Sequence, residues 1–130
     1  MTKLTAGQLV ELVEQHYFHN VDGKNIGTVL DCFAEDAVLS VQTAGAVHSG
    51  RDGAIRKMFE GFMGDIKTIY HGDFTHVVDA ENQKVATQFV ARNDYDDGRH
   101  VEMRNCNFFE LEDGLFKRVT IYMSGENPLV

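Results

Sequence analysis

The sequence contains few of the residues on which several special classes of protein depend. Its 130 residues include two cysteines and one proline, and they include no tryptophan. The cysteines, Cys32 and Cys106, form neither a CxxC pair nor a disulfide framework, and the first residues lack the apolar core of a signal peptide. We therefore expect a reducing, cytoplasmic location, and we interpret both cysteines as small core residues.

Basic residues are also scarce, with 12 against 20 acidic ones, and the formal net charge is −8. Binding to nucleic acids and to anionic membranes depends on basic patches, so this charge argues against both as partners. No segment approaches the ~20 apolar residues of a membrane-spanning helix. What is present is a hydrophobic share of 43%, ordinary for a globular chain, and we expect residues 1–130 to form one domain.

The helical spacing of apolar residues predicts three helices in the first half of the chain. They cover residues 5–19, 26–33 and 51–62. Thr5 is expected to cap the first helix, and Gly61 and Gly64 are expected to help end the third. Two short strands, over residues 38–42 and 46–48, separate the second helix from the third.

Four long strands are predicted in the second half, over residues 67–78, 84–95, 100–112 and 115–123. Asp113-Gly114, between the last two, is a strong signal for a tight hairpin turn. Helices followed by an antiparallel meander indicate an α+β fold. We predict a cone-shaped α+β barrel, in which three N-terminal helices pack in a curved, mostly antiparallel sheet and the mouth of the cone is a ligand site.

The last hairpin is predicted to present two different faces. Its inner face would form the floor of a pocket and carry Asn105, Asn107, Phe109, Val119 and Met123. Two amides beside apolar neighbours need partners or a ligand. The outer face, with Phe116, Arg118 and Tyr122, is half apolar, which is typical of a contact between subunits.

A family resemblance rests on three segments, Phe33-Ala34-Glu35-Asp36-Ala37, His48-Ser49-Gly50-Arg51-Asp52 and Phe109-Glu110-Leu111-Glu112-Asp113-Gly114. With the order of the elements, they resemble the nuclear-transport-factor-two-like superfamily, and within it the SnoaL-like group, which also holds ketosteroid isomerase and scytalone dehydratase. The resemblance implies a small-molecule pocket without a cofactor and a homodimer formed through the outer sheet face. The superfamily includes isomerases, dehydratases, cyclases, epoxide hydrolases and binding domains, so the fold does not select a reaction.

The resemblance to the isomerases is partial at the level of single residues. Tyr17 falls where they keep an oxyanion-hole tyrosine, and Asn105 falls where they keep an oxyanion-hole acid. Val41 occupies the position of their general base, an aspartate. The resemblance therefore implies that the steroid-isomerase mechanism is absent.

The resemblance to the dehydratase places three polar residues together. Asp22, His71 and Asn105 fall at its aspartate, at one of its two catalytic histidines and at its substrate-binding asparagine. Phe89 takes the place of the second histidine. Phe59 and Phe89, with Val41, are expected to line the cone.

These residues suit acid–base chemistry, although each has a structural alternative. An imidazole group can take and return a proton near neutral pH, which suits His71 to acid–base work, and an aspartate such as Asp22 could fix its tautomer. Asn105 and Tyr17 could donate hydrogen bonds to a carbonyl oxygen or an oxyanion. Alternatively, His71 bonds to the backbone, Asp22 caps the next helix, and Tyr17 is part of the core.

The remaining histidines do not suggest a metal site. They are His16, His19, His48, His76 and His100, and a surface role is predicted for each. On a regular strand His71 and His76 would face opposite sides of the sheet.

Three hypotheses follow for the function. The first is a cofactor-independent enzyme that transfers a proton on a small apolar oxygenated molecule, by isomerisation, dehydration or cyclisation, with His71 as acid or base. The second is a dimeric domain that binds a small molecule without chemistry. The third is a dimeric scaffold with a filled cone. A hydrogen bond between His71 and Asp22 in the pocket would favour the enzyme, and a pocket too small for a ligand would favour the scaffold.

Overall fold

The computed structural model describes residues 2–125 and 128–129. Its first helical segment is continuous and consists of α1 (Ala6–Glu11), the π-helical η1 (Leu12–Phe18) and α2 (His19–Asp22). Thr5 caps it as predicted: its hydroxyl accepts a hydrogen bond from the Gln8 backbone N–H, and the Gln8 side chain accepts one from the Thr5 N–H. The helix extends past the predicted end at residue 19, and this extra turn brings Asp22 to the sheet.

Two further helical segments complete the helical layer. The first, α3 (Ile26–Leu30), is shorter than predicted, because Phe33 already begins strand β1. The other joins η3 (Gly50–Ile55) to α4 (Arg56–Asp65). Gly61 and Gly64 lie inside α4, and the helix ends at Asp65, where the backbone of Ile66 becomes extended.

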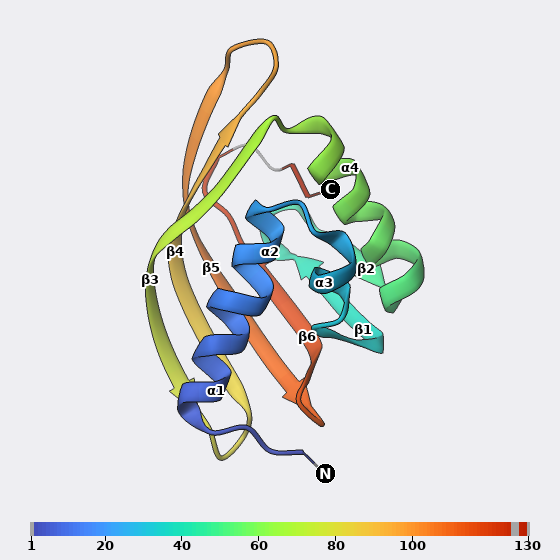
Figure 1. Cartoon of the computed structure of the whole chain (residues 1–130), viewed down its shortest axis with the longest axis vertical. Helices are drawn as coiled ribbons and strands as arrows, with labels where there is room; N and C mark the ends of the chain where they lie inside the picture. The colour runs from blue at the N-terminus through green and yellow to red at the C-terminus, as the bar shows by residue number, and fades with distance from the viewer. Residues whose placement is uncertain (1, 126–127, 130) are drawn as a thin grey trace.

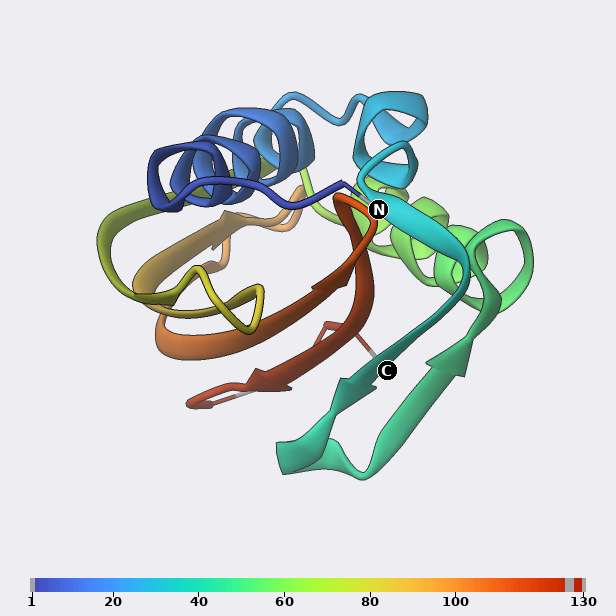
Figure 2. The same cartoon turned by 90° about the horizontal axis from the view of Figure 1, so that it is seen from below.

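Six strands form one sheet with the order β2-β1-β6-β5-β4-β3. Their bounds are β1 (Phe33–Val41), β2 (Ala46–Ser49), β3 (Thr68–Asp79), β4 (Lys84–Asp94), β5 (His100–Glu112) and β6 (Leu115–Tyr122), and the short η2 (Gln42–Ala44) joins the first two. The pair β1–β6 is parallel and the other pairs are antiparallel. The predicted α+β architecture with a mostly antiparallel sheet is confirmed (Figure 1). The sheet curls beneath the helices without closing, and β2 and β3 are its edges (Figure 2).

A β-bulge in β6 changes the faces of the last hairpin. Glu110 pairs with Arg118 and Leu111 pairs with Phe116, so Lys117 is an extra residue in β6. The bulge turns Phe116 toward the helices, where its ring is fully buried. The prediction that Phe116 lies on the outer face is therefore wrong, whereas Tyr122 is exposed there as predicted.

A second bulge lies in β3, where Gly72 pairs with Val90 and Thr75 pairs with Gln88. Asp73 lies in the bulge with a φ of 54°. A Cβ at position 72 would lie 2.1 Å from the Tyr70 hydroxyl, so a larger residue than glycine there requires the Tyr70 ring to move. The extra residue places His76 on the same face as His71, so the prediction that they face opposite sides is wrong.

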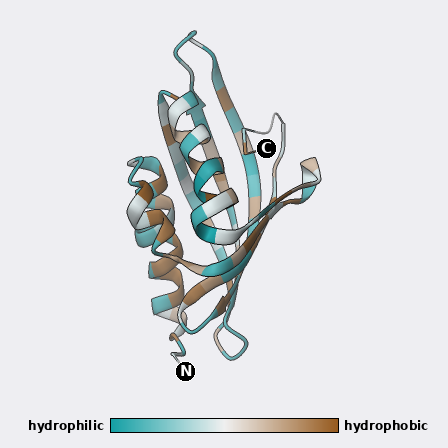
Figure 3. Ribbon diagram, turned by 90° about the vertical axis from the view of Figure 1, so that its right-hand side faces the viewer, coloured by the Kyte–Doolittle hydropathy of each residue, from teal (hydrophilic) through white to brown (hydrophobic). Residues whose placement is uncertain are grey.

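The core lies between the helices and the concave face of the sheet. Tyr17 contacts the rings of Phe33, Phe59, Phe109 and Phe116 edge to face, and these aromatics fill the space beneath the first helix. Hydrophobic and hydrophilic segments alternate along the helices and strands, as expected for elements with one buried face (Figure 3). Within residues 2–125 and 128–129, no helix has the length and apolar character needed to span a membrane.

Candidate functional site

A narrow cavity of about 30 Å³ lies between the helical layer and the sheet, with room for little more than water. It is lined by Tyr17, Phe18, Val21, Phe59, Phe62, His71, Phe89, Ala91, Asn93, Met103, Asn105, Asn107, Ile121, Met123, Pro128 and Leu129. Most of these side chains are apolar. The polar ones therefore stand out as candidates for binding or chemistry.

His71 and Asp22 form the most specific polar contact at this cavity. The Asp22 carboxylate lies at the C-terminal end of α2, and its Oδ2 accepts a hydrogen bond from the backbone N–H of His71 at 2.9 Å. Its Oδ1 lies 2.5 Å from His71 Nδ1. Asp22 does not cap α3, whose N-cap, Asn25, provides no side-chain hydrogen bond. The two predicted residues thus meet, with His71 in the cavity wall and Asp22 bonded to it, and the helix-capping alternative is excluded.

The double contact with Asp22 determines which ring nitrogen of His71 carries the proton. A carboxylate only accepts hydrogen bonds, so Nδ1 carries the proton and Nε2 of the neutral ring presents a lone pair. Among the described residues nothing bonds to Nε2. The ring packs against Phe18 and Phe89, with centroids at 4.9 and 5.5 Å, and these contacts fix its plane. The His71 imidazole is therefore held in one orientation among apolar side chains.

Tyr17 and Asn105 are the predicted hydrogen-bond donors, and both line the cavity. Burial raises the pKa of the Tyr17 phenol well above its usual value, and nearby Cys32 and Asp22 raise it further, so the hydroxyl stays neutral and can donate. Asn105 Oδ1 accepts a hydrogen bond from the Ser124 N–H at 3.1 Å. That bond identifies the oxygen of the amide and leaves its NH₂ group for another partner.

The other predicted pocket residues divide into two groups. Phe59, Phe89, Asn107 and Met123 line the cavity. The structure places Val41, Phe109 and Val119 in the core instead, each fully buried and absent from the cavity wall. Around Phe109 and its partner Val119, aromatic rings fill the space between the sheet and the helices. Side chains there point to the concave face but do not reach the cavity.

Sequence analysis missed several lining residues, and Asn93 on β4 is the most informative. It alternates along the strand with Phe89 and Ala91, so the same period-two pattern could have identified it. Asn93 Oδ1 and Asn107 Oδ1 are the two buried side-chain atoms of the described residues that have no hydrogen-bond partner. Such atoms are rare in native folds, and both belong to this cavity.

A second histidine cluster lies on the same face, farther along β3. His76 Nε2 lies 2.5 Å from Glu14 Oε2, and His76 Nδ1 lies 2.9 Å from the Thr87 hydroxyl. The surface role predicted for His76 is wrong, because the β3 bulge turns the ring toward η1. Within the described residues, no three His, Cys, Asp or Glu side chains are grouped closely enough to hold a metal ion.

Comparison with known proteins assigns the family. The SnoaL-like domain family matches residues 14–119, which is most of the chain. The chain belongs to the SnoaL-like family. The resemblance predicted from the sequence is thereby confirmed. No curated protein matches this SnoaL-like chain in sequence.

Solved structures with a similar fold include three that were named for different activities. A candidate isomerase from Bacillus subtilis has a TM-score of 0.79 and 15% identity, covering 91% of this SnoaL-like chain and 87% of its own. A candidate polyketide cyclase from Xanthomonas campestris pv. campestris has a TM-score of 0.78 and 22% identity, and the match covers 89% of this chain and 90% of the cyclase. The pinacolase BvnE from Penicillium brevicompactum has a TM-score of 0.78 and 14% identity, and the match covers 95% of this chain and 88% of the pinacolase. At these identities the likeness shows the fold, and the reaction has to be argued from the site.

Proposed function

We propose that the protein is a cofactor-independent enzyme that transfers a proton on a small, largely apolar, oxygenated molecule held in the cavity. The reaction would be an isomerisation, a dehydration or a cyclisation. The observation that carries this proposal is the contact of His71 Nδ1 with Asp22 Oδ1 at 2.5 Å in the wall of an apolar cavity. His71 lines the cavity, and nothing among the described residues bonds to its Nε2, which supports a role for this nitrogen toward a bound molecule.

The mechanism assigns one role to each polar group. His71 Nε2 takes a proton from a carbon beside a carbonyl group, and the electron pair of the broken C–H bond moves to the carbonyl oxygen. The Tyr17 hydroxyl and the Asn105 NH₂ donate hydrogen bonds to that oxygen as it gains charge. Asp22 stabilises the imidazolium. The proton then returns to another carbon in an isomerisation, or to a departing hydroxyl group in a dehydration.

This proposal can be tested without knowing the natural substrate. In D₂O, an enzyme of this kind should accelerate exchange of the α-protons of 2-tetralone, a small apolar ketone, which NMR follows directly. We expect His71→Ala to lower the protein-dependent rate to background. His100→Ala is the matched control, because His100 Nδ1 also lies 2.5 Å from an aspartate, Asp94, but on the exposed surface. Equal rates for wild type and His71→Ala would reject the proposal.

One observation favours a second candidate, the dimeric scaffold with a filled cone. The cavity of about 30 Å³ is smaller than any organic substrate, so a ligand requires the wall to move. Pro128 and Leu129 form part of that wall, and the Leu129 carbonyl contacts His48 Nε2 at 2.9 Å. A cavity that admits no organic molecule in solution would favour this candidate.

We also propose that two copies of the chain pair through the outer face of the sheet. Val77, Ala86, Phe108 and Thr120 follow one another across four strands, and Val77 and Phe108 are 71% and 46% exposed. Beside this row is a groove of about 440 Å³, which Tyr122 also lines. Exposed apolar rows of this kind are typical of subunit contacts.

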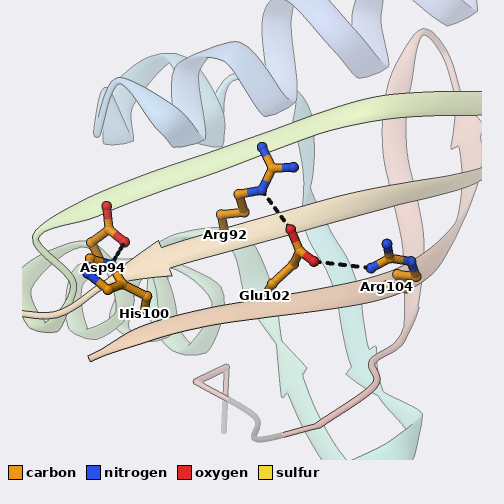
Figure 4. A network of polar contacts seen from close by, with 5 residues as sticks. All are labelled: Arg92, Asp94, His100, Glu102 and Arg104. Carbon is orange, nitrogen blue, oxygen red and sulfur yellow. Dashed lines mark hydrogen bonds and ion pairs between the residues drawn. The ribbon is translucent and has the colours of Figure 1, made fainter. Parts of the chain in front are cut away.

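Charges on the same face limit where a second copy can pack. On β4 and β5, Arg92 and Arg104 both contact Glu102, and His100 contacts Asp94 (Figure 4). These groups are exposed and would be costly to desolvate. Beside the apolar row, Glu110 lies between Lys84 and Arg118, an alternation of charge that a two-fold related copy can complement. The apolar row therefore fits a second copy better than the charged end does.

A further inference from the structure

The side-chain amide of Asn107 has no function in the fold. Asn107 is 2% exposed on the concave face of β5, and it lines the cavity. Its Oδ1 has no hydrogen-bond partner among the described residues. Burying an amide without a partner is unfavourable, so the fold alone would favour an apolar side chain at this position.

The neighbours of Asn107 do not compensate for this cost. Asn107 pairs with Thr87 on β4 and with Ile121 on β6. The Thr87 hydroxyl already contacts His76 Nδ1 at 2.9 Å, and Ile121 has no polar group. Asn105, two residues away on the same face, differs because its oxygen binds the Ser124 N–H. The Asn105 amide therefore has a structural role, and the Asn107 amide does not.

Asn107 lies at the inner end of the cavity. One step deeper on the same face, Phe109 and its partner Val119 are fully buried and close the space. In the other direction β5 becomes more accessible, since Val101 is half-buried and His100 is exposed. A molecule that enters the cavity would therefore bring its leading end to Asn107, whose oxygen has no partner and whose amide group can accept or donate a hydrogen bond.

We propose that the side-chain amide of Asn107 forms a hydrogen bond with a hydroxyl or amine group at the inner end of the ligand. This inference rests on the proposed function in one respect, that the cavity is the binding site. Asn107 thereby selects molecules that carry a polar hydrogen-bonding group at that end. A ligand with a methyl group there would leave the oxygen unpaired, and sites of this kind discriminate strongly against such analogues. Asn105 lies about 7 Å from Asn107 on the same strand. Its free NH₂ group can donate a hydrogen bond to an acceptor on the ligand.

Phenol and toluene test this inference, because they match in size and differ in a hydroxyl against a methyl group. Dissociation constants of both would be measured by ¹H–¹⁵N NMR titration of the wild type and of Asn107→Leu. We expect phenol, and not toluene, to shift the Asn107 side-chain NH₂ signals. We expect the preference for phenol over toluene to fall at least tenfold in Asn107→Leu. The free variant should melt at a higher temperature than the wild type, since the unpaired oxygen is gone.

Asn93→Leu is the matched comparison, because Asn93 is equally buried in the same cavity and its oxygen is also unpaired, but it lies six positions away in register. Its preference for phenol should fall clearly less than that of Asn107→Leu. The inference is overturned by an unchanged preference in Asn107→Leu, by an equal loss in Asn93→Leu, by a lower melting temperature of free Asn107→Leu, or by no binding of phenol. These measurements involve no turnover, so they can fail while the His71-dependent exchange of 2-tetralone protons still stands.

Discussion

Asp22 holds His71 at two points, with one carboxylate oxygen on the backbone N–H and the other on ring Nδ1. The two residues are 49 positions apart in sequence, so the contact joins the end of the first helical segment to β3. It fixes the tautomer and the orientation of the ring together. The proposed chemistry depends on this relationship more than on any other in the molecule.

Replacing Asp22 with Asn should lower the rate of 2-tetralone proton exchange by about 10²- to 10⁴-fold, the range of general acid–base effects. An amide can donate to Nδ1 and thereby place the proton on Nε2, the wrong nitrogen for a base. Asp94→Asn, at the exposed pair with His100, should change the rate less than twofold. Equal rates for Asp22→Asn and the wild type would show that Asp22 has only a structural role.

Tyr17→Phe should slow the same exchange by about 10-fold to 10³-fold, the size expected for one oxyanion donor. The ring is retained, so the aromatic contacts and the melting temperature at neutral pH should change little. Exchange rates and thermal unfolding of the same preparation would separate the two effects. A fall in stability without a fall in rate would assign Tyr17 to the core.

Stability should decrease as the pH rises above 9 to 10. Burial raises the pKa of the Cys32 thiol from 9.0 to about 12, and it raises the pKa of the Tyr17 phenol well above its usual value of 10.0. Both groups lose protons in the unfolded chain first, so the unfolded state gains stability as pH rises through its own pKa values. Urea unfolding at pH 8 and pH 10.5 should show a smaller decrease for Cys32→Ala and Tyr17→Phe than for the wild type. Equal decreases would contradict the burial of these groups.

Phe116→Ala should destabilise the fold by about 3–5 kcal/mol, as is typical of a fully buried aromatic residue. Phe108→Ala, at an exposed position of the neighbouring strand, should cost about 1 kcal/mol or less in a monomer. Urea denaturation would measure both. Similar costs for the two would place Phe116 on the outer face and would contradict the bulge at Lys117.

Phe108→Glu should convert a dimer into a monomer if two copies pair through the outer face. The change places a charge in the apolar row, where pairing would bury it without a partner. Val47→Glu is a control, because Val47 is 63% exposed but lies on β2. Analytical ultracentrifugation measures the mass of each. A monomeric wild type, or a Phe108→Glu variant that remains dimeric, would contradict this pairing.

Much of the fold could be predicted because its signals are local. The Asp113-Gly114 turn adopts the two positive φ angles, 52° and 77°, that this pair favours, and it sets the ends of β5 and β6. Thr5 and Gln8 form a capping box that begins the first helix. Alternation along β5 predicted the inward direction of Asn105 and Asn107.

The errors arise where tertiary packing overrides a regular period. One extra residue, Lys117 in β6 or Asp73 in β3, shifts the alternation on one side of the bulge relative to the other, and no residue type near it signals the change. The predicted directions of the Phe116 and His76 side chains are wrong for this reason. Asp22, His71 and Asn105 were located by resemblance, whereas the contact between Asp22 and His71 required the structure.

The central claim is that Asp22 keeps a proton on His71 Nδ1 and leaves Nε2 as the base on the cavity side. Long-range ¹H–¹⁵N NMR of the imidazole rings distinguishes the two tautomers, and His71→Ala identifies the signals that belong to His71. We predict an Nδ1–H tautomer in the neutral wild-type ring, and loss of that preference in Asp22→Asn. A neutral His71 ring with its proton on Nε2 in the wild type would contradict the account.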